Sequence, residues 1–98
     1  MAETFVHNPT AERFEAWVDG EFVGELVYRR TGSTLVFEST HINTGTLVVG
    51  LGSRLVGYAF GRVREQGDLR VRADCPYVRS WIARHGGVAD LLVEPSLG

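Results

Sequence analysis

Apolar and polar residues alternate early in the chain with the two-residue period of β-strands. Every second residue from Phe14 to Val18 is suited to face a core, and Asp19-Gly20 is typical of a two-residue hairpin turn. Residues 22–28 then form the returning strand. A second turn at residues 30–33 precedes residues 34–42, which are rich in β-branched and aromatic side chains. This pattern predicts a three-stranded antiparallel meander.

The apolar period lengthens to about 3.6 residues after Gly50, which indicates an amphipathic helix. Its broad apolar face contains Leu51, Leu55, Val56, Ala59, Phe60 and Val63. Gly67 is expected to end this helix in a left-handed cap, and residues 69–73 alternate as another strand. Pro76 suits the first turn of a second helix, which is expected to continue to Gly86-Gly87.

A chain of 98 residues is long enough for one hydrophobic core and too short for two. Residues 1–12 are polar and contain Pro9, so we expect an N-terminal lead-in of low order, followed by a single domain over residues 13–98. A short apolar segment, Leu91-Leu92-Val93, closes the pattern. The predicted class is therefore α+β, with an antiparallel β-meander followed by α-β-α.

Composition and charge narrow the functional classes. A formal net charge of -2 lacks the basic excess of nucleic-acid-binding domains, so no nucleic-acid partner is expected. The sequence shows no membrane-spanning run, no signal pattern and one cysteine, and we expect a cytoplasmic protein with no membrane partner and no metal site. Arginines outnumber acidic residues over residues 51–85, which suits either an anionic small ligand or a solvated helix face.

The turn Val49-Gly50-Leu51-Gly52 is the first candidate for chemistry. The start of a helix exposes backbone N–H groups without partners in the helix, and the helix dipole adds positive potential there. Such a turn suits a phosphate group, which Gly50 and Gly52 would allow to approach closely. Two glycines at a helix start are also common for structural reasons alone, so the pattern by itself leaves both interpretations open.

From about Phe14 to Leu92 the sequence resembles the small, YjdJ-like branch of the GNAT N-acetyltransferases. The resembling segments are FEAWVDGEFVGELVYRR, GLGSRLVGYAFGRVREQG and the ending CPYVRSWIARH with ADLL. The most specific feature is the Cys-Pro-aromatic sequence followed by a short helix, a closing Arg-His and a later Asp-Leu. The resemblance implies a minimal GNAT (acyl-CoA N-acyltransferase) fold, with acetyl-CoA as cosubstrate bound between two splayed central strands.

The pyrophosphate pattern of that family, Gln/Arg-x-x-Gly-x-Gly/Ala, falls on residues 47–52. Both glycines match, but Leu47 replaces the polar or basic first residue. Related sequences also tend to have Gly where Val48 stands and His-Thr where Ser39-Thr40 stands. We therefore expect binding mainly by backbone groups, with Arg54 compensating for the missing side chain. The expected cofactor-binding residues are Val49, Gly50, Leu51, Gly52, Ser53 and Arg54.

The resemblance implies direct attack of an amine on the thioester carbonyl, helped by a base and by an acid. Cys75 corresponds to the family's cysteine and could be a thiolate nucleophile, an acid near the sulfur or a small packing residue. Tyr77 is a candidate acid for the departing thiolate, or a packed aromatic. His41 could take the amine proton, or lie exposed at a strand end. Glu38 is expected to face away from Ser39 and His41.

One row of small residues belongs to no acetyltransferase motif. Ser53, Gly57 and Gly61 recur every four residues, away from the apolar face of the helix. Each helix-interior Gly costs about 1 kcal/mol relative to Ala, so the row suggests close approach of a second chain or of the C-terminal segment, with chance as the alternative. The row and an exposed meander edge are compatible with a homodimer.

Three functions follow from these patterns. The first is an N-acetyltransferase that acts on an unknown amine acceptor. The second is a non-catalytic GNAT-like domain that binds CoA, motivated by the changes at Ser39, Leu47 and Val48. The third is a protein-interaction module without a ligand, which rests on the glycine row.

Overall fold

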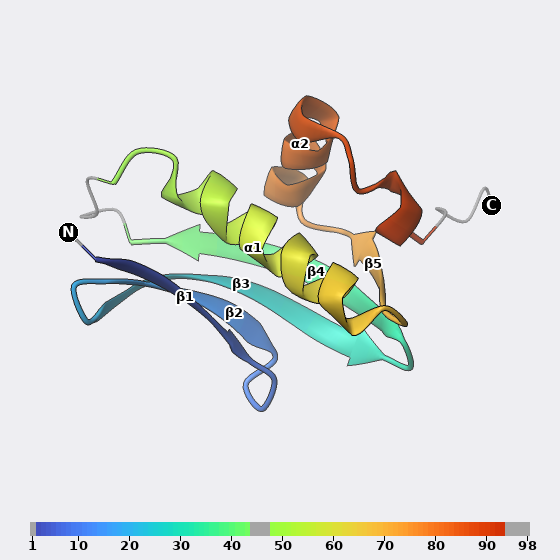
Figure 1. The fold of residues 1–98 in the computed structure, drawn as a ribbon, viewed down its shortest axis with the longest axis horizontal. Coiled ribbons are helices and arrows are strands. Elements are labelled where there is room, and N and C mark those ends of the chain that lie inside the picture. The colour runs from blue at the N-terminus through green and yellow to red at the C-terminus, as the bar shows by residue number, and fades with distance from the viewer. Residues whose placement is uncertain (1, 44–47, 94–98) are drawn as a thin grey trace.

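The computed structural model describes residues 2–43 and 48–93, which fold around one five-stranded sheet in the order β1-β2-β3-β4-β5 (Figure 1). The first four strands are antiparallel neighbours, and the last pairs in parallel with β4 through a helical crossover. The strands are β1 (Glu3–Asn8), β2 (Arg13–Val18), β3 (Glu21–Thr31), β4 (Thr34–Ile42) and β5 (Arg70–Ala73).

Two helices cover one side of this sheet (Figure 1). α1 (Leu51–Gln66) packs against β1 to β4, and α2 (Pro76–His85) packs against α1, β4 and β5. A 3-10 turn (Ala89–Leu91) follows α2. Gly67 ends α1 in the left-handed conformation with φ 82°, and Pro76 opens α2, both as predicted. The α+β class and the order of a meander followed by α-β-α are confirmed.

The expectation of a poorly ordered lead-in is wrong for residues 3–8, which form β1. This strand pairs with β2 from Glu3↔Val18 to Asn8↔Arg13, so the meander has four antiparallel strands. Phe5 stacks on Tyr58 of α1 at 5.6 Å between ring centroids. The apolar side chain of an edge strand therefore helps to fix α1 over the sheet.

A run of aromatic contacts connects the sheet to both helices. Phe14 of β2 meets Phe37 of β4 at 5.9 Å, Phe37 meets Phe60 of α1 at 5.4 Å, and Phe60 stacks on Trp81 of α2 at 5.4 Å. Such ring pairs contribute about 0.5–1.5 kcal/mol each beyond their buried area. The positions of the two helices are therefore coupled through the middle of the core.

Among the described residues, α2 approaches the first two positions of the row Ser53-Gly57-Gly61. Trp81 donates its indole N–H to the Ser53 hydroxyl at 3.1 Å. A β-carbon on Gly57 would lie 3.6 Å from the Trp81 ring, whereas Gly61 faces open space. The small residues at 53 and 57 therefore let the two helices approach each other, and Gly61 contributes nothing to that contact.

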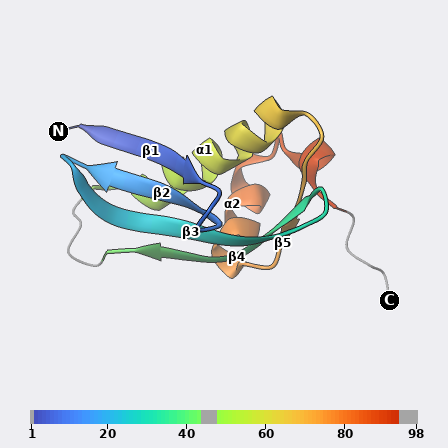
Figure 2. The ribbon, with the colours of Figure 1, turned by 90° about the horizontal axis from the view of Figure 1, so that it is seen from below.

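The other side of the sheet carries no helix among the described residues, and Figure 2 views the molecule from that side. We call this side the open face; its strands β2 to β4 present Arg13, Glu15, Trp17, Glu25 and His41. Glu15 is only 5% exposed there and accepts hydrogen bonds from Asn8, Arg13 and Trp17. Burial alone would raise the pKa of Glu15, but these three hydrogen bonds together lower it below its usual value.

Candidate functional site

The turn before α1 has the geometry of an anion site. Gly50 caps the helix with φ 79°, and no side chain caps this end. The amide of Arg54 donates to the carbonyl of Gly50 at 3.0 Å, so the amides of Leu51, Gly52 and Ser53 precede the first helical hydrogen bond of this turn. Together with the helix dipole, these amides favour a bound anion such as phosphate.

Close contacts require both glycines of the turn. A β-carbon on Gly50 would lie 2.9 Å from Nη1 of Arg54, in a backbone conformation that already disfavours side chains. A β-carbon on Gly52 would lie 2.5 Å from the hydroxyl oxygen of Tyr77. Gly52 therefore allows the Tyr77 phenol, which is 40% exposed, to lie against the start of α1.

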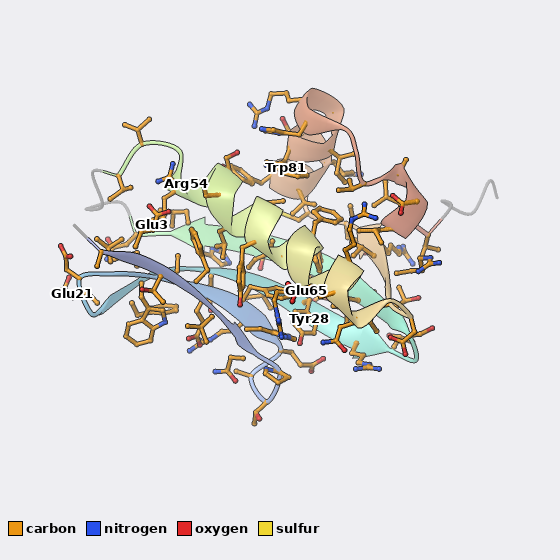
Figure 3. All side chains as sticks on the ribbon, viewed as in Figure 1. Glu3, Glu21, Tyr28, Arg54, Glu65 and Trp81 are labelled. Atoms are coloured by element: carbon orange, nitrogen blue, oxygen red, sulfur yellow. The ribbon has the colours of Figure 1, made fainter. Side chains whose placement is uncertain are left out.

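Arg54 is held at this turn by a residue of β1. Its Nε and Nη2 atoms each donate to one carboxylate oxygen of Glu3 at 2.7 Å, and Nη1 donates to the carbonyl of Val49 at 3.0 Å. Figure 3 shows Glu3 and Arg54 facing each other between β1 and the start of α1. The hydrogen bond from Arg54 lowers the pKa of Glu3 despite some desolvation. Sequence reasoning missed Glu3 because it assigned this segment to the lead-in.

The parallel strands β4 and β5 separate beside α2. Their last paired residues are Phe37 and Ala73. The carbonyl of Phe37 then accepts the amides of both Asp74 and Cys75, at 3.0 and 2.9 Å, which turns the chain into α2 while β4 continues to Ile42. The edge of β4 beyond Phe37 is therefore left without a partner from β5.

A bulge in β4 marks the same point. Tyr28 of β3 pairs with Phe37 and Val27 pairs with Ser39, so Glu38 is the extra residue. Its exposed carboxylate forms an ion pair with Arg29 at 3.4 Å. The bulge shifts the alternation of β4, which decides which of the later residues face the helices.

Cys75 lies inside this opening, with 3% of its surface exposed. Its Sγ atom is 3.5 Å from the hydroxyl oxygen of Thr40. Thr40 pairs with Leu26, which is fully buried beneath the helices, so this contact lies on the helix side of the sheet. The structure thus places the predicted cysteine next to Thr40 of β4, which matches the Thr of the family's His-Thr pair and was given no role of its own from the sequence.

His41 lies on the opposite side of the sheet from Cys75. It is exposed and pairs with Glu25 on the open face. The three candidate catalytic residues therefore occupy three places: Cys75 in the opening, Tyr77 beside Gly52, and His41 on the open face. Their catalytic roles stay predictions.

Two further features bear on the predicted site. Trp81, which lies in the second predicted helix and was given no role from the sequence, donates to the Ser53 hydroxyl oxygen and leaves the hydroxyl proton free to donate elsewhere. The indole N–H of a buried Trp usually has a hydrogen-bond partner. The sequence could therefore have predicted a polar partner for Trp81, but not which residue it would be. Leu47 lies outside the described residues, while Val48 packs partly buried against the core.

The described residues form no cluster of three side chains that could hold a metal ion. None of the helices in this part of the chain has the length and apolar character needed to cross a membrane.

The mixed sheet, opened between its parallel strands beside a glycine-containing helix start, defines a GNAT-like fold. The model of the family described as GCN5-related N-acetyl-transferase matches residues 13–91, and the chain belongs to this family. The solution structure of a GCN5-like protein from Staphylococcus aureus is similar, with a TM-score of 0.68 and 15% identity over 92% of this chain and 87% of that one. No curated protein matches. The YjdJ-like branch stays a prediction.

Proposed function

We propose that this chain binds acetyl-CoA and transfers its acyl group to an amine. The observation that carries the proposal is that the start of α2 touches both candidate parts of the site. Tyr77 lies against Gly52 at the anion-binding turn, and two residues earlier Cys75 contacts Thr40 in the opening between β4 and β5. One ligand with a phosphate end and a reactive end could therefore span the two.

The pyrophosphate of CoA is assigned to the free amides at the start of α1. The hydroxyls of Ser53 and Tyr77 add two side-chain donors at this position. The unpaired edge of β4 after Phe37 offers backbone groups to the amides of the pantetheine arm, much as a strand partner would. This path ends with the thioester beside Cys75 and Thr40.

In the proposed reaction the amine nitrogen bonds to the thioester carbonyl carbon and the carbon–sulfur bond breaks. The departing CoA thiolate takes a proton from an acid, and the amine gives a proton to a base. Cys75 is proposed as the acid because its thiol lies in the opening. His41 is proposed as the base for an amine that reaches the opening from the open face, where His41 lies.

The second candidate function is CoA binding without catalysis. The observation that favours it is the surroundings of Cys75, whose Sγ has Thr40 as its polar side-chain contact within the described part of the chain. A domain of this kind would bind CoA and change its affinity for a partner.

Calorimetric titration with acetyl-CoA and with CoA, followed by a turnover assay over a panel of amines, separates the two functions. Binding with release of free thiol in the presence of one amine is the expected result. Binding without turnover across the panel would favour the non-catalytic function. No heat at millimolar ligand would exclude both.

A further inference from the structure

The N-terminal strand brings a carboxylate to the predicted ligand site, although β1 lies before the residues that match the family model, 13–91. We propose that Glu3 is an internal counter-ion that competes with the phosphates of CoA for Arg54. The proposal rests on the proposed function, since it concerns the same ligand. It assigns to Glu3 the role of setting how tightly the site holds that ligand.

The geometry of the pair supports this competition. A guanidinium has five N–H donors, and Arg54 directs two of them to Glu3 in the paired arrangement that phosphate oxygens also accept. A third donor, on Nη1, holds the carbonyl of Val49 and keeps the guanidinium over Gly50. Arg54 is therefore already in position at the turn, with a carboxylate where a phosphate would bind.

The charges explain the direction of the effect. The positive end of α1 and Arg54 both attract an anion, but Glu3 cancels the charge of Arg54 and repels a phosphate that approaches the turn. Removing the Glu3 charge should thus strengthen phosphate binding. If Glu3 served only to orient Arg54, removing it would weaken binding.

The ion pair is also open enough to exchange partners. The side chain of Arg54 is 46% exposed and that of Glu3 is 24% exposed. A pair with this much solvent contact contributes little to folding, so its opening costs little. The pyrophosphate of CoA carries two negative charges, against one on the carboxylate of Glu3, and can therefore displace that carboxylate from Arg54.

The test compares Glu3→Gln with the wild-type chain by calorimetric titration of CoA at low salt. The side-chain amide of Gln keeps the shape of the Glu3 carboxylate and removes its charge. We therefore expect the dissociation constant for CoA to fall about three- to tenfold. Glu65→Gln is the matched control, because Glu65 pairs with Arg62 at 3.2 Å on α1 and its loss makes the same change in net charge. This control should leave CoA affinity within about twofold.

A second comparison assigns the effect to Arg54. In an Arg54→Met background, Glu3→Gln should no longer tighten CoA binding, because the guanidinium for which Glu3 and the phosphates compete is absent. A direct readout is the Nε–H resonance of Arg54 in the wild-type chain, which should move when CoA replaces Glu3. Thermal unfolding of each variant checks that the fold is retained.

The outcomes separate this proposal from the one on which it rests. Absence of CoA binding by both the wild-type chain and Glu3→Gln would end the proposed function, and this inference with it. Binding by the wild-type chain with equal or weaker binding by Glu3→Gln would overturn the inference alone. If Glu65→Gln gained as much CoA affinity as Glu3→Gln, the effect would be one of net charge alone, and the inference would also be overturned.

Discussion

The Tyr77 hydroxyl lies so close to Gly52 that a β-carbon at position 52 would come within 2.5 Å of it. This contact joins the first turns of two helices that are separated in the chain by β5. A side chain at position 52 would therefore displace the Tyr77 ring from the start of α1, at the point where the ligand is expected. The same contact gives Tyr77 its place beside the turn that is proposed to bind the pyrophosphate.

Gly52→Ala should accordingly destabilise the fold by about 1–3 kcal/mol, as overpacked sites do. The cost should shrink in a Tyr77→Ala background, because the clashing hydroxyl is gone. Urea unfolding of the two single variants and the double variant measures this coupling. Gly61→Ala is the matched control, since a β-carbon there meets open space and should stabilise α1 by about 1 kcal/mol. Additive effects of Gly52→Ala and Tyr77→Ala would contradict the contact.

Gly50→Val should weaken CoA binding by at least about tenfold, because the turn would lose its left-handed residue and the side chain would meet Arg54. Gly67→Val provides the comparison, as Gly67 has nearly the same φ, 82°, at the other end of α1. Both variants should lose stability, but only Gly50→Val should lose affinity in calorimetric titration. Equal affinity in the two variants would refute the assignment of the pyrophosphate.

Trp81→Phe should keep the stacking on Phe60 and lose the hydrogen bond to Ser53. We expect a loss of about 0.5–1.5 kcal/mol in the free energy of unfolding. CoA affinity should also fall, since the Ser53 hydroxyl is no longer oriented. Trp17→Phe is the control, because it removes an indole donor to Glu15 on the open face. Loss of affinity in the control as well would show that the effect is not local to the site.

Cys75→Ala should lower kcat by about 10²-fold or more if the thiol protonates the departing sulfur, while the dissociation constant for acetyl-CoA changes little. Thr40→Val tests whether the neighbouring hydroxyl positions that thiol, and it should give a smaller loss in kcat. Steady-state kinetics with the best amine of the panel measures both. Full activity in Cys75→Ala would leave Cys75 as a packing residue.

The stability of the fold should depend on the ionisation of Glu15. The pKa of Glu15 is lower in the folded chain than its usual 4.5. Between these two pKa values the folded state therefore binds fewer protons than the unfolded state. Its contribution is therefore complete above about pH 4.5 and is lost as the pH falls through the folded pKa. Urea unfolding between about pH 7 and pH 3 should show this acid-induced loss.

The matched variants are Glu15→Gln and Glu21→Gln. Glu15→Gln should reduce the acid-induced loss and lower stability at neutral pH by about 1–3 kcal/mol, because Arg13 loses its buried partner. Glu21 is exposed at the start of β3, and its variant should behave like the wild-type chain. An unchanged pH dependence in Glu15→Gln would contradict the role of Glu15.

The fold could be predicted largely from the sequence, because periodicity reports which residues face the core. The period of two located β2 to β4, and the longer period located α1. The first strand was missed because β1 lies at the edge of the sheet in a largely polar segment that is followed by Pro9, and this composition was given more weight than its alternation. The strand became visible only through its pairing with β2 and the packing of Phe5 on α1.

The candidate site was harder to predict because it depends on contacts between distant residues. Glu3 and Arg54 are 51 residues apart, about half the length of the chain, and no local pattern encodes their contact. The position of Cys75 next to Thr40, with His41 on the other face, depends on the bulge at Glu38. A count of alternating residues does not detect a bulge, whereas the glycine turn was found because its chemistry lies in the backbone.

The open face bears on the size of the molecule that such a chain could modify. No helix among the described residues stands over Ser39 and His41, so on that side nothing forms a wall around an incoming amine. An enclosed pocket selects small acceptors because its walls sterically exclude large molecules. Here an amine on the surface of a folded macromolecule could approach as freely as a metabolite, and discrimination would then depend on what docks against β2, β3 and β4.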